Sequence, residues 1–250
     1  MIGITLDSTE RLGVIVRFLE RFRVRPWVRL ICDMESDGFK WDQLLKPCEE
    51  ISKVADIMIT VADSYYISKI TPAQYEKRTQ KVLDTYGKWI QCVEVGNEIA
   101  GDWLGPEQSV LEKVHRANAL VRNSGVRSAV TWYLDGSNQN QMWGMIDRAE
   151  ISADWHLISW YPNWTPNVKP DWDAVFRRLG TRFPYSSVGF GEFGAEPRRA
   201  SQAKKASLIR EIYSIRPKVN NFIGLYFYWS TFRSIQKNER EILDALVEYR

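Results

Sequence analysis

The chain has 250 residues, of which 44% are hydrophobic, with a formal net charge of +3 and three cysteines. This length suits one large domain and is common for α/β barrels. The scattered Lys and Arg argue against a nucleic-acid partner. The odd number of cysteines and the lack of a CxxC spacing argue against a disulfide framework or a zinc knuckle. No apolar run approaches the roughly 20 residues that span a bilayer.

Eight short apolar runs are predicted strands, and they begin near Ile2, Trp27, Ile57, Cys92, Val126, Trp155, Val188 and Phe222. Helical patterns lie between them. One opens at Thr71-Pro72 with a capping residue and a first-turn proline and runs to about Trp89. Others run from Gly105 to Arg122 and from Ser201 to about Arg216. Strands that alternate with helices predict an α/β fold with a parallel sheet. Eight such units predict a (β/α)8 TIM barrel that forms a single domain over residues 1–250. An open doubly wound sheet is the alternative.

Two glutamates each end a predicted strand and stand among glycines. Glu98 ends Val95-Gly96-Asn97-Glu98 after the fourth strand, and Glu192 lies in Gly189-Phe190-Gly191-Glu192-Phe193-Gly194 at the end of the seventh. Active sites of (β/α)8 barrels lie at the carboxyl ends of the strands, so these side chains should converge across the mouth. Glycosidic cleavage needs such a pair, one protonating the leaving oxygen and the other attacking or activating water. Two solvated loop glutamates are the alternative.

At these residues the chain resembles the clan A glycoside hydrolases, also called the 4/7 superfamily. In that clan an Asn-Glu pair after strand four supplies the acid/base, and a glutamate after strand seven is the nucleophile. Asn97-Glu98 and Glu192 match these positions, and Arg29 in Val28-Arg29-Leu30 matches the strand-two arginine that holds the nucleophile.

Two aromatic motifs extend the resemblance. Ser159-Trp160-Tyr161-Pro162-Asn163-Trp164 resembles the strand-six tyrosine motif of cellulases, mannanases and galactanases, and Tyr226-Phe227-Tyr228-Trp229-Ser230 resembles the strand-eight tryptophan that floors the central sugar site. The chain departs from the pattern at Ser159, where many members have His, and at Ile99, where cellulase-like members have Pro. The resemblance therefore leaves the family within the clan open.

The resemblance implies a retaining glycoside hydrolase for β-linked glycans. Glu192 would attack the anomeric carbon, and Glu98 would serve as acid and then as base. Arg29 and Tyr161 would keep Glu192 ionised, and Asn97 would hold a sugar 2-hydroxyl. The alternatives are that Arg29 bridges to another carboxylate such as Asp33 or Asp63, that Tyr161 packs in the core and that Asn97 is a turn residue.

Tryptophan is abundant, with 11 residues. Flat apolar rings stack on sugars, so tryptophans at or beyond strand ends are candidate platforms: the predicted substrate-binding Trp132, Trp164 and Trp229, together with Trp103 and Trp160. Those near strand starts or in helices are expected in the core: Trp27, Trp89, Trp155 and Trp172.

Other functions remain as alternatives. Gly189 to Gly194 spells G-x-G-x-x-G, but at the seventh strand it is a weak dinucleotide fingerprint. Barrels often bind phosphate near strands seven and eight, so a phosphosugar enzyme is one alternative, and a non-catalytic glycan-binding barrel is the other. With only two histidines, His115 and His156, a His-rich metal site is excluded.

We expect a carbohydrate partner, no cofactor, no metal, no nucleic acid, no membrane and a monomer. The chain as given is expected in the cytoplasm, or outside the cell if an export signal has been removed.

Overall fold

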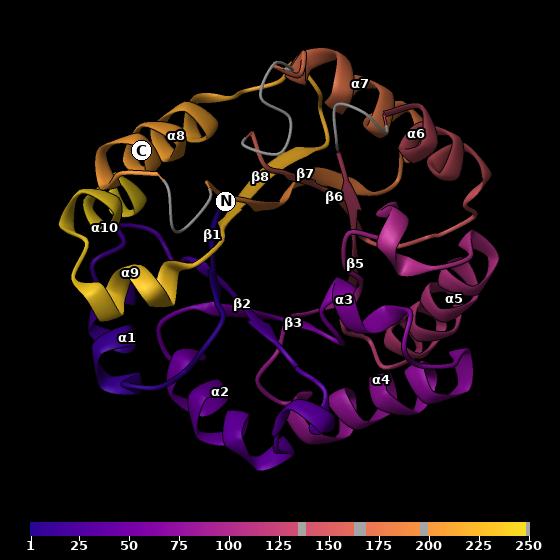
Figure 1. The fold of residues 1–250 in the computed structure, drawn as a ribbon, viewed down its shortest axis with the longest axis horizontal. Helices are drawn as coiled ribbons and strands as arrows, with labels where there is room; N and C mark the ends of the chain where they lie inside the picture. Colours follow the sequence, from indigo (N-terminus) through magenta and orange to yellow (C-terminus); the bar gives the residue numbers. More distant parts are fainter. Residues whose placement is uncertain (135–138, 163–168, 196–199, 249–250) are drawn as a thin grey trace.

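The computed structural model describes residues 1–134, 139–162, 169–195 and 200–248. Its eight parallel strands close into a barrel in chain order, with β1 beside β8 (Figure 1). The strands are β1 Ile2–Leu6, β2 Trp27–Ile31, β3 Asp56–Thr60, β4 Cys92–Gly96, β5 Arg127–Tyr133, β6 Trp155–Trp160, β7 Ser187–Phe193 and β8 Phe222–Tyr228. This confirms the predicted (β/α)8 barrel and is incompatible with an open sheet.

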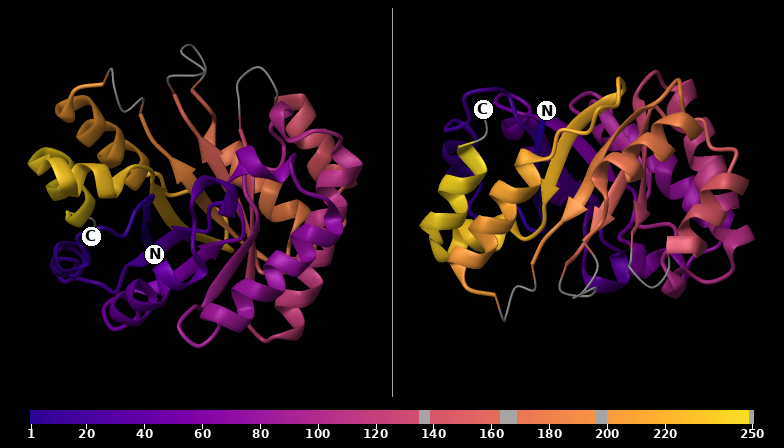
Figure 2. Two further views of the ribbon diagram at one scale, coloured as in Figure 1. Left: turned by 60° about the horizontal axis from the view of Figure 1, so that its bottom comes forward. Right: turned by 90° about the horizontal axis from the view of Figure 1, so that it is seen from above.

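Helices cover the outside of the barrel, as the side views show (Figure 2). They are α1 Leu12–Leu19, α2 Leu45–Ile51, α3 Ser64–Ile67, α4 Pro72–Tyr86, α5 Glu107–Asn123, α6 Gln139–Arg148, α7 Trp172–Arg182, α8 Gln202–Ser214, α9 Thr231–Lys237 and α10 Arg240–Val247, with short 3-10 turns at Glu35–Asp37, Trp41–Leu44 and Asp102–Leu104. No helix in the part of the chain that the structure describes is long and apolar enough to cross a bilayer.

The predicted helix starts rest on capping side chains. Thr71 Oγ1 accepts a hydrogen bond from the backbone N–H of Gln74, whose side chain accepts one from the Thr71 N–H in return. Ser201 Oγ likewise accepts from the backbone N–H of Lys204. Each bond satisfies an amide that the first helical turn leaves without a partner. The first of these helices ends at Tyr86, three residues before the predicted Trp89.

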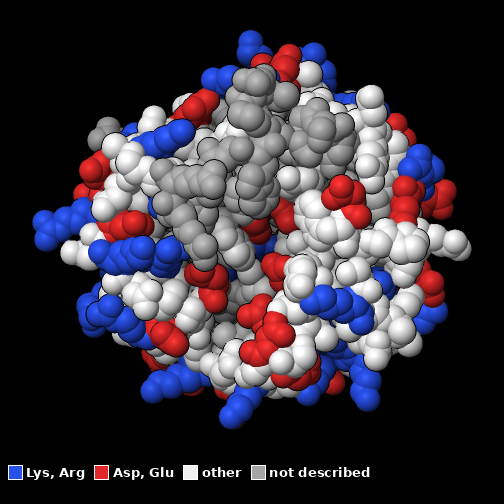
Figure 3. All heavy atoms as spheres, in the orientation of Figure 1, with Lys and Arg blue, Asp and Glu red and all other residues white. Residues whose placement is uncertain are grey.

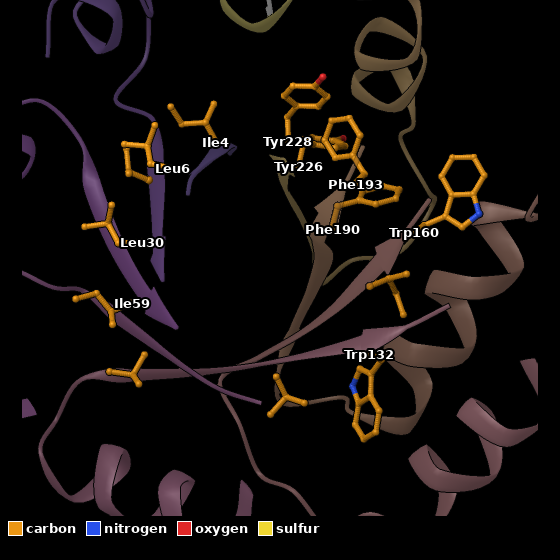
Figure 4. Packing of buried hydrophobic residues seen from close by; sticks show 14 of the residues in the cluster. Ile4, Leu6, Leu30, Ile59, Trp132, Trp160, Phe190, Phe193, Tyr226 and Tyr228 are labelled. Atoms are coloured by element: carbon orange, nitrogen blue, oxygen red, sulfur yellow. The ribbon is translucent and has the colours of Figure 1, made fainter. Parts of the chain in front are cut away.

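The core has two layers. The larger lies between the outer face of the barrel and the helices, where side chains such as Ile4, Leu30 and Phe190 point away from the barrel axis (Figure 4). The smaller fills the inside of the barrel near its N-terminal end with Trp27, Met58, Cys92, Ala129, Trp155, Leu157, Leu225 and Phe227. Cys32, Cys48 and Cys92 are buried free thiols.

A polar layer lies above this apolar plug. Residues two apart on a strand share a face, so the position two residues beyond each plug residue also lies inside the barrel, closer to its carboxyl end. In five strands the sequence changes from apolar to polar at this step: Trp27 to Arg29, Met58 to Thr60, Cys92 to Glu94, Ala129 to Thr131, and Leu157 to Ser159. All five polar side chains are fully buried. The interior is therefore apolar at one end and polar at the other.

A β-bulge interrupts this alternation on β7. Ile158 pairs with Phe190, but the next residue, Ser159, pairs with Glu192, so β7 carries one extra residue. Phe190 and Phe193 both point to the helix layer although they are three residues apart (Figure 4). The extra residue is Gly191, where a Cβ would collide with the side chain of Thr131. The bulge thus allows Glu192 to join the interior face.

The structure corrects the prediction that Trp132 binds substrate. Trp132 follows the inward-facing Thr131, so its side chain points outward into the helix layer (Figure 4). It is fully buried, its Nε1–H donates to His156 Nδ1 at 3.2 Å, and its ring stacks on Phe183. Trp160 is also buried on the outer side, edge to face with Trp172, and is therefore no sugar platform. Both rings belong to the core.

We predict that Trp132→Ala lowers the free energy of unfolding by about 3 to 5 kcal/mol, the usual cost of removing a large buried ring. Urea unfolding followed by circular dichroism measures this loss. Trp103→Ala is the matched control, because the Trp103 side chain is 38% exposed and its removal should cost much less. Equal unfolding midpoints for the two variants would contradict the assignment of Trp132 to the core.

Candidate active site

Two buried glutamates lie at the carboxyl end of the barrel. Glu98 follows β4 and is 7% exposed, and Glu192 lies on β7 and is 5% exposed. The backbone of Glu98 is left-handed, with φ of 54°. This conformation is uncommon for a residue with a side chain and is found preferentially at functional sites.

Two serine hydroxyls hold the Glu98 carboxyl group. Ser159 Oγ donates to Glu98 Oε1 at 2.5 Å, and Ser64 Oγ donates to Oε2 at 3.1 Å. Ser159 is the Cα partner of Glu192 across the β6–β7 pair, so one residue links the surroundings of both glutamates. The departure from the clan pattern at position 159 therefore falls on a direct partner of Glu98.

Different groups hold the Glu192 carboxyl group. Arg29 Nη1 donates to Glu192 Oε2 at 2.5 Å, and the Tyr161 hydroxyl donates to Oε1. The Arg29 side chain is completely buried and forms ion pairs with Glu192 and Glu94, whereas Asp33 and Asp63 had been its alternative partners. Gly194 leaves room for Tyr161, because a Cβ there would lie 3.0 Å from the tyrosine ring.

Sequence reasoning missed three polar residues around these glutamates. Glu94 on β4 is fully buried and accepts hydrogen bonds from Arg29 Nε at 2.8 Å, from Thr60 Oγ1 at 2.5 Å and from Thr131 Oγ1. A signal was present, since a carboxylate inside an apolar strand needs a partner as much as Arg29 does. Ser159 had a signal as well, since it occupies the motif position where many clan members have His, whereas Ser64 had none, because serine is common at any depth.

The two glutamates have different electrostatic surroundings. Burial, reinforced by the charge of Glu192, raises the pKa of Glu98 to about 8, although the hydroxyl of Ser159 opposes the rise. Burial also raises the pKa of Glu192, but the Arg29 guanidinium and the Tyr161 hydroxyl oppose that rise by stabilising the anion. The pKa of Tyr161 lies well above its usual range because of burial and the nearby Glu192, so Tyr161 remains a hydrogen-bond donor. The cation beside Glu192 thus favours its ionised form, whereas the serine hydroxyls around Glu98 bring no positive charge, so the Glu98 environment favours the protonated form.

The remaining predicted site residues lie in different settings. Asn97 is 1% exposed, and its Oδ1 has no hydrogen-bond partner among the described residues. Trp229 directly follows β8, is half-buried, and its backbone N–H donates to the carbonyl of Phe193 at 2.8 Å, which ties it to the residue after Glu192. Trp164 lies outside the described residues. Trp103, after β4, packs edge to face on Tyr133.

Acidic side chains surround the two glutamates. Asp7, Asp33 and Asp63 follow β1, β2 and β3, and acidic groups gather around the middle of this face of the barrel (Figure 3). Burial and the neighbouring Asp63 raise the pKa of Asp33. Within the described ranges, no group of three or more His, Cys, Asp or Glu side chains is arranged to hold a metal ion.

Comparison with sequence-family models finds no match, and no curated protein matches the chain. Solved structures do match its fold. Saccharomyces cerevisiae Gas2p in complex with laminaritriose and laminaritetraose superposes with a TM-score of 0.60 at 14% identity, over 99% of this chain and 64% of Gas2p. The chain thus spans less than two thirds of that protein.

Two further structures cover more of their own length. A psychrophilic family 10 endo-β-1,4-xylanase superposes with a TM-score of 0.68 at 10% identity, over 100% of this chain and 96% of the xylanase. A β-glucosidase in its apo form superposes with a TM-score of 0.66 at 11% identity, over 90% of this chain and 78% of the enzyme. At these identities the likeness concerns the fold alone: the chain shares the eight-stranded barrel of these proteins.

Proposed function

We propose that this protein is a retaining glycoside hydrolase that acts on β-linked glycans or oligosaccharides. One observation carries the proposal: two buried glutamates at the barrel mouth have opposite partners. Glu98 accepts only from serine hydroxyls in the contacts described above, whereas Glu192 is bound by a guanidinium and a phenol. Environments that separate two carboxyl groups in this way assign one as the acid and the other as the anion.

The proposed reaction has two steps. A Glu192 oxygen forms a bond to the anomeric carbon while the bond to the leaving oxygen breaks, and Glu98 transfers its proton to that oxygen. A water molecule then attacks the anomeric carbon, Glu98 takes its proton, and the bond to Glu192 breaks. The sugar leaves with its original anomeric configuration, and both carboxyl groups return to their starting states. No cofactor takes part in this scheme.

Other side chains would bind the sugar. The Asn97 side chain, whose buried Oδ1 lacks a partner among the described residues, would hold the 2-hydroxyl, a contact that strengthens as positive charge develops on the ring. Trp229 would stack against the central sugar, and Trp164 against a neighbouring one. The solved structure of Gas2p is a complex with laminaritriose and laminaritetraose, which supports a carbohydrate substrate here.

We predict retention of configuration, with the two carboxyl groups about 5 to 5.5 Å apart, because direct attack by Glu192 leaves no room for a water molecule between them. Proton NMR of the first product, recorded before mutarotation, measures the outcome. An inverted anomer would instead require a water between the carboxyl groups and a separation of about 6.5 to 9.5 Å.

The roles of the two glutamates can be separated by substitution. Glu192→Ala should abolish turnover of aryl glycosides, and azide or formate should restore part of it by occupying the vacated space. Glu98→Ala should retain activity on substrates with good leaving groups, because these need little acid assistance. Initial rates across a series of leaving groups, with and without azide, measure both effects.

Glu150→Ala, at an exposed position, is the control and should be unaffected. Reversed responses of the two variants would show that their roles are exchanged. Sugar binding without turnover on any glycan of a broad panel would favour a non-catalytic binding protein.

The basic side of the pH profile should report Glu98. If Glu98 donates the proton, kcat/KM should fall as the pH rises through its pKa of about 8. Ser159→Ala removes a hydroxyl that stabilises the ionised form, so the pKa should rise and the basic limb should move to higher pH.

Ser128→Ala is a matched control, since Ser128 is also a buried serine but lies near the start of β5, at the other end of the barrel. Profiles of kcat/KM against pH for the wild type and both variants test the assignment. A basic limb that stays in place in Ser159→Ala would show that another group controls it.

A further inference from the structure

The guanidinium of Arg29 lies between two carboxylates. Its Nε donates to Glu94 Oε2 at 2.8 Å and its Nη1 donates to Glu192 Oε2 at 2.5 Å. Its Nη2 lies 2.7 Å from Glu94 Oε2 within the ion pair but makes no hydrogen bond among the described residues. All three side chains are buried, Arg29 and Glu94 completely. Two of the three guanidinium nitrogens therefore lie beside a carboxylate that the proposed reaction does not use, and one of them donates a hydrogen bond to it.

Glu94 is held rigidly by its own partners. Thr60 Oγ1 on β3 and Thr131 Oγ1 on β5 donate to Glu94 from the two strands beside β4. Thr131 fits because Gly191 has no Cβ. With Arg29, these hydroxyls give both Glu94 oxygens a hydrogen-bond donor, so neither oxygen of this buried carboxyl group is left unsatisfied.

We infer that Glu94 is a positioning residue of the proposed reaction: it shares Arg29 with Glu192, so that the nucleophile is held but only partly neutralised, and Arg29 stays paired throughout the cycle. This inference rests on the proposed function. With both carboxylates ionised, the three groups carry a formal charge of −1, and the excess negative charge lies at Glu192. A guanidinium that belonged to Glu192 alone would quench the charge that must attack the sugar.

The charge balance during the reaction shows why a second carboxylate is needed. When Glu192 forms its bond to the anomeric carbon, its negative charge is lost and the electron pair of the broken bond goes to the leaving oxygen, which takes the proton of Glu98. Arg29 then pairs with Glu94 alone, as a neutral ion pair. Without Glu94, the glycosyl-enzyme would contain an unpaired buried cation, a costly state, and the transition state would place it near a sugar that is itself becoming positive.

The test compares two substitutions with opposite expected effects. Glu94→Gln removes a negative charge and gives Arg29 to Glu192, so the pKa of Glu192 should fall by about 1. Arg29→Met removes the positive charge, so the same pKa should rise. Carbon-13 NMR of labelled glutamate carboxyl groups in the absence of substrate, with the Glu192 signal assigned by Glu192→Gln, measures both shifts directly.

Kinetics give a second measurement. In Glu94→Gln the acidic limb of kcat/KM should move to lower pH, and the rate of glycosyl-enzyme formation should fall by up to about 100-fold, because the nucleophile is quenched and misplaced. Asp154→Asn is the matched control. It makes the same carboxylate-to-amide change at the N-terminal end of the barrel, where Asp154 accepts from the backbone N–H of Ser128, and the acidic limb should stay in place.

If Glu94→Gln does not fold, Glu94→Asp provides the same test. The shorter side chain keeps the negative charge but moves it away from Arg29. The Glu192 pKa should therefore still fall and the acidic limb should still move to lower pH, each by less than in Glu94→Gln. An unchanged or raised Glu192 pKa in a folded Glu94 variant would overturn the inference, whatever its stability. A wild-type protein without glycosidase activity would overturn the proposed function instead, because the NMR titration needs no substrate.

Discussion

A completely buried guanidinium is the constraint on which the rest of the barrel mouth depends. Arg29 lies on the inner face of β2, above a plug of apolar side chains. A charge at that depth is stable only with carboxylates around it, and these come from β4 and β7 as Glu94 and Glu192. The ion pairs thus connect strands that are far apart in the sequence. They also hold Glu192 at the carboxyl end of the barrel, near Glu98.

Small residues around this network are as necessary as the charges. The bulge at Gly191 turns Glu192 inward and makes space for Thr131, and Gly194 lets the Tyr161 ring approach Glu192. A serine rather than a larger side chain at position 159 brings a hydroxyl to Glu98. The glycine-rich segment that resembles a nucleotide-binding motif therefore has a packing explanation, and a phosphate ligand is not needed to account for it.

The barrel fold does not by itself define the chemistry of the site. The barrel superposes on a xylanase, a β-glucosidase and Gas2p at only 10 to 14% identity, because many sequences satisfy the alternation of strand and helix that builds it. The proposed activity rests instead on the different surroundings of Glu98 and Glu192. Those surroundings consist of this chain's own serines, arginine and tyrosine.

The sequence by itself determined the strand and helix order and the two strand-end glutamates, because local periodicity and capping are short-range properties. It could not place Trp132, since both faces of a parallel barrel strand are buried and alternation alone does not say which face is inside. Nor could it reveal that Glu94 shares Arg29, or that Ser159 contacts Glu98. Those contacts join residues 61 to 65 positions apart, and only the closure of the barrel brings them together.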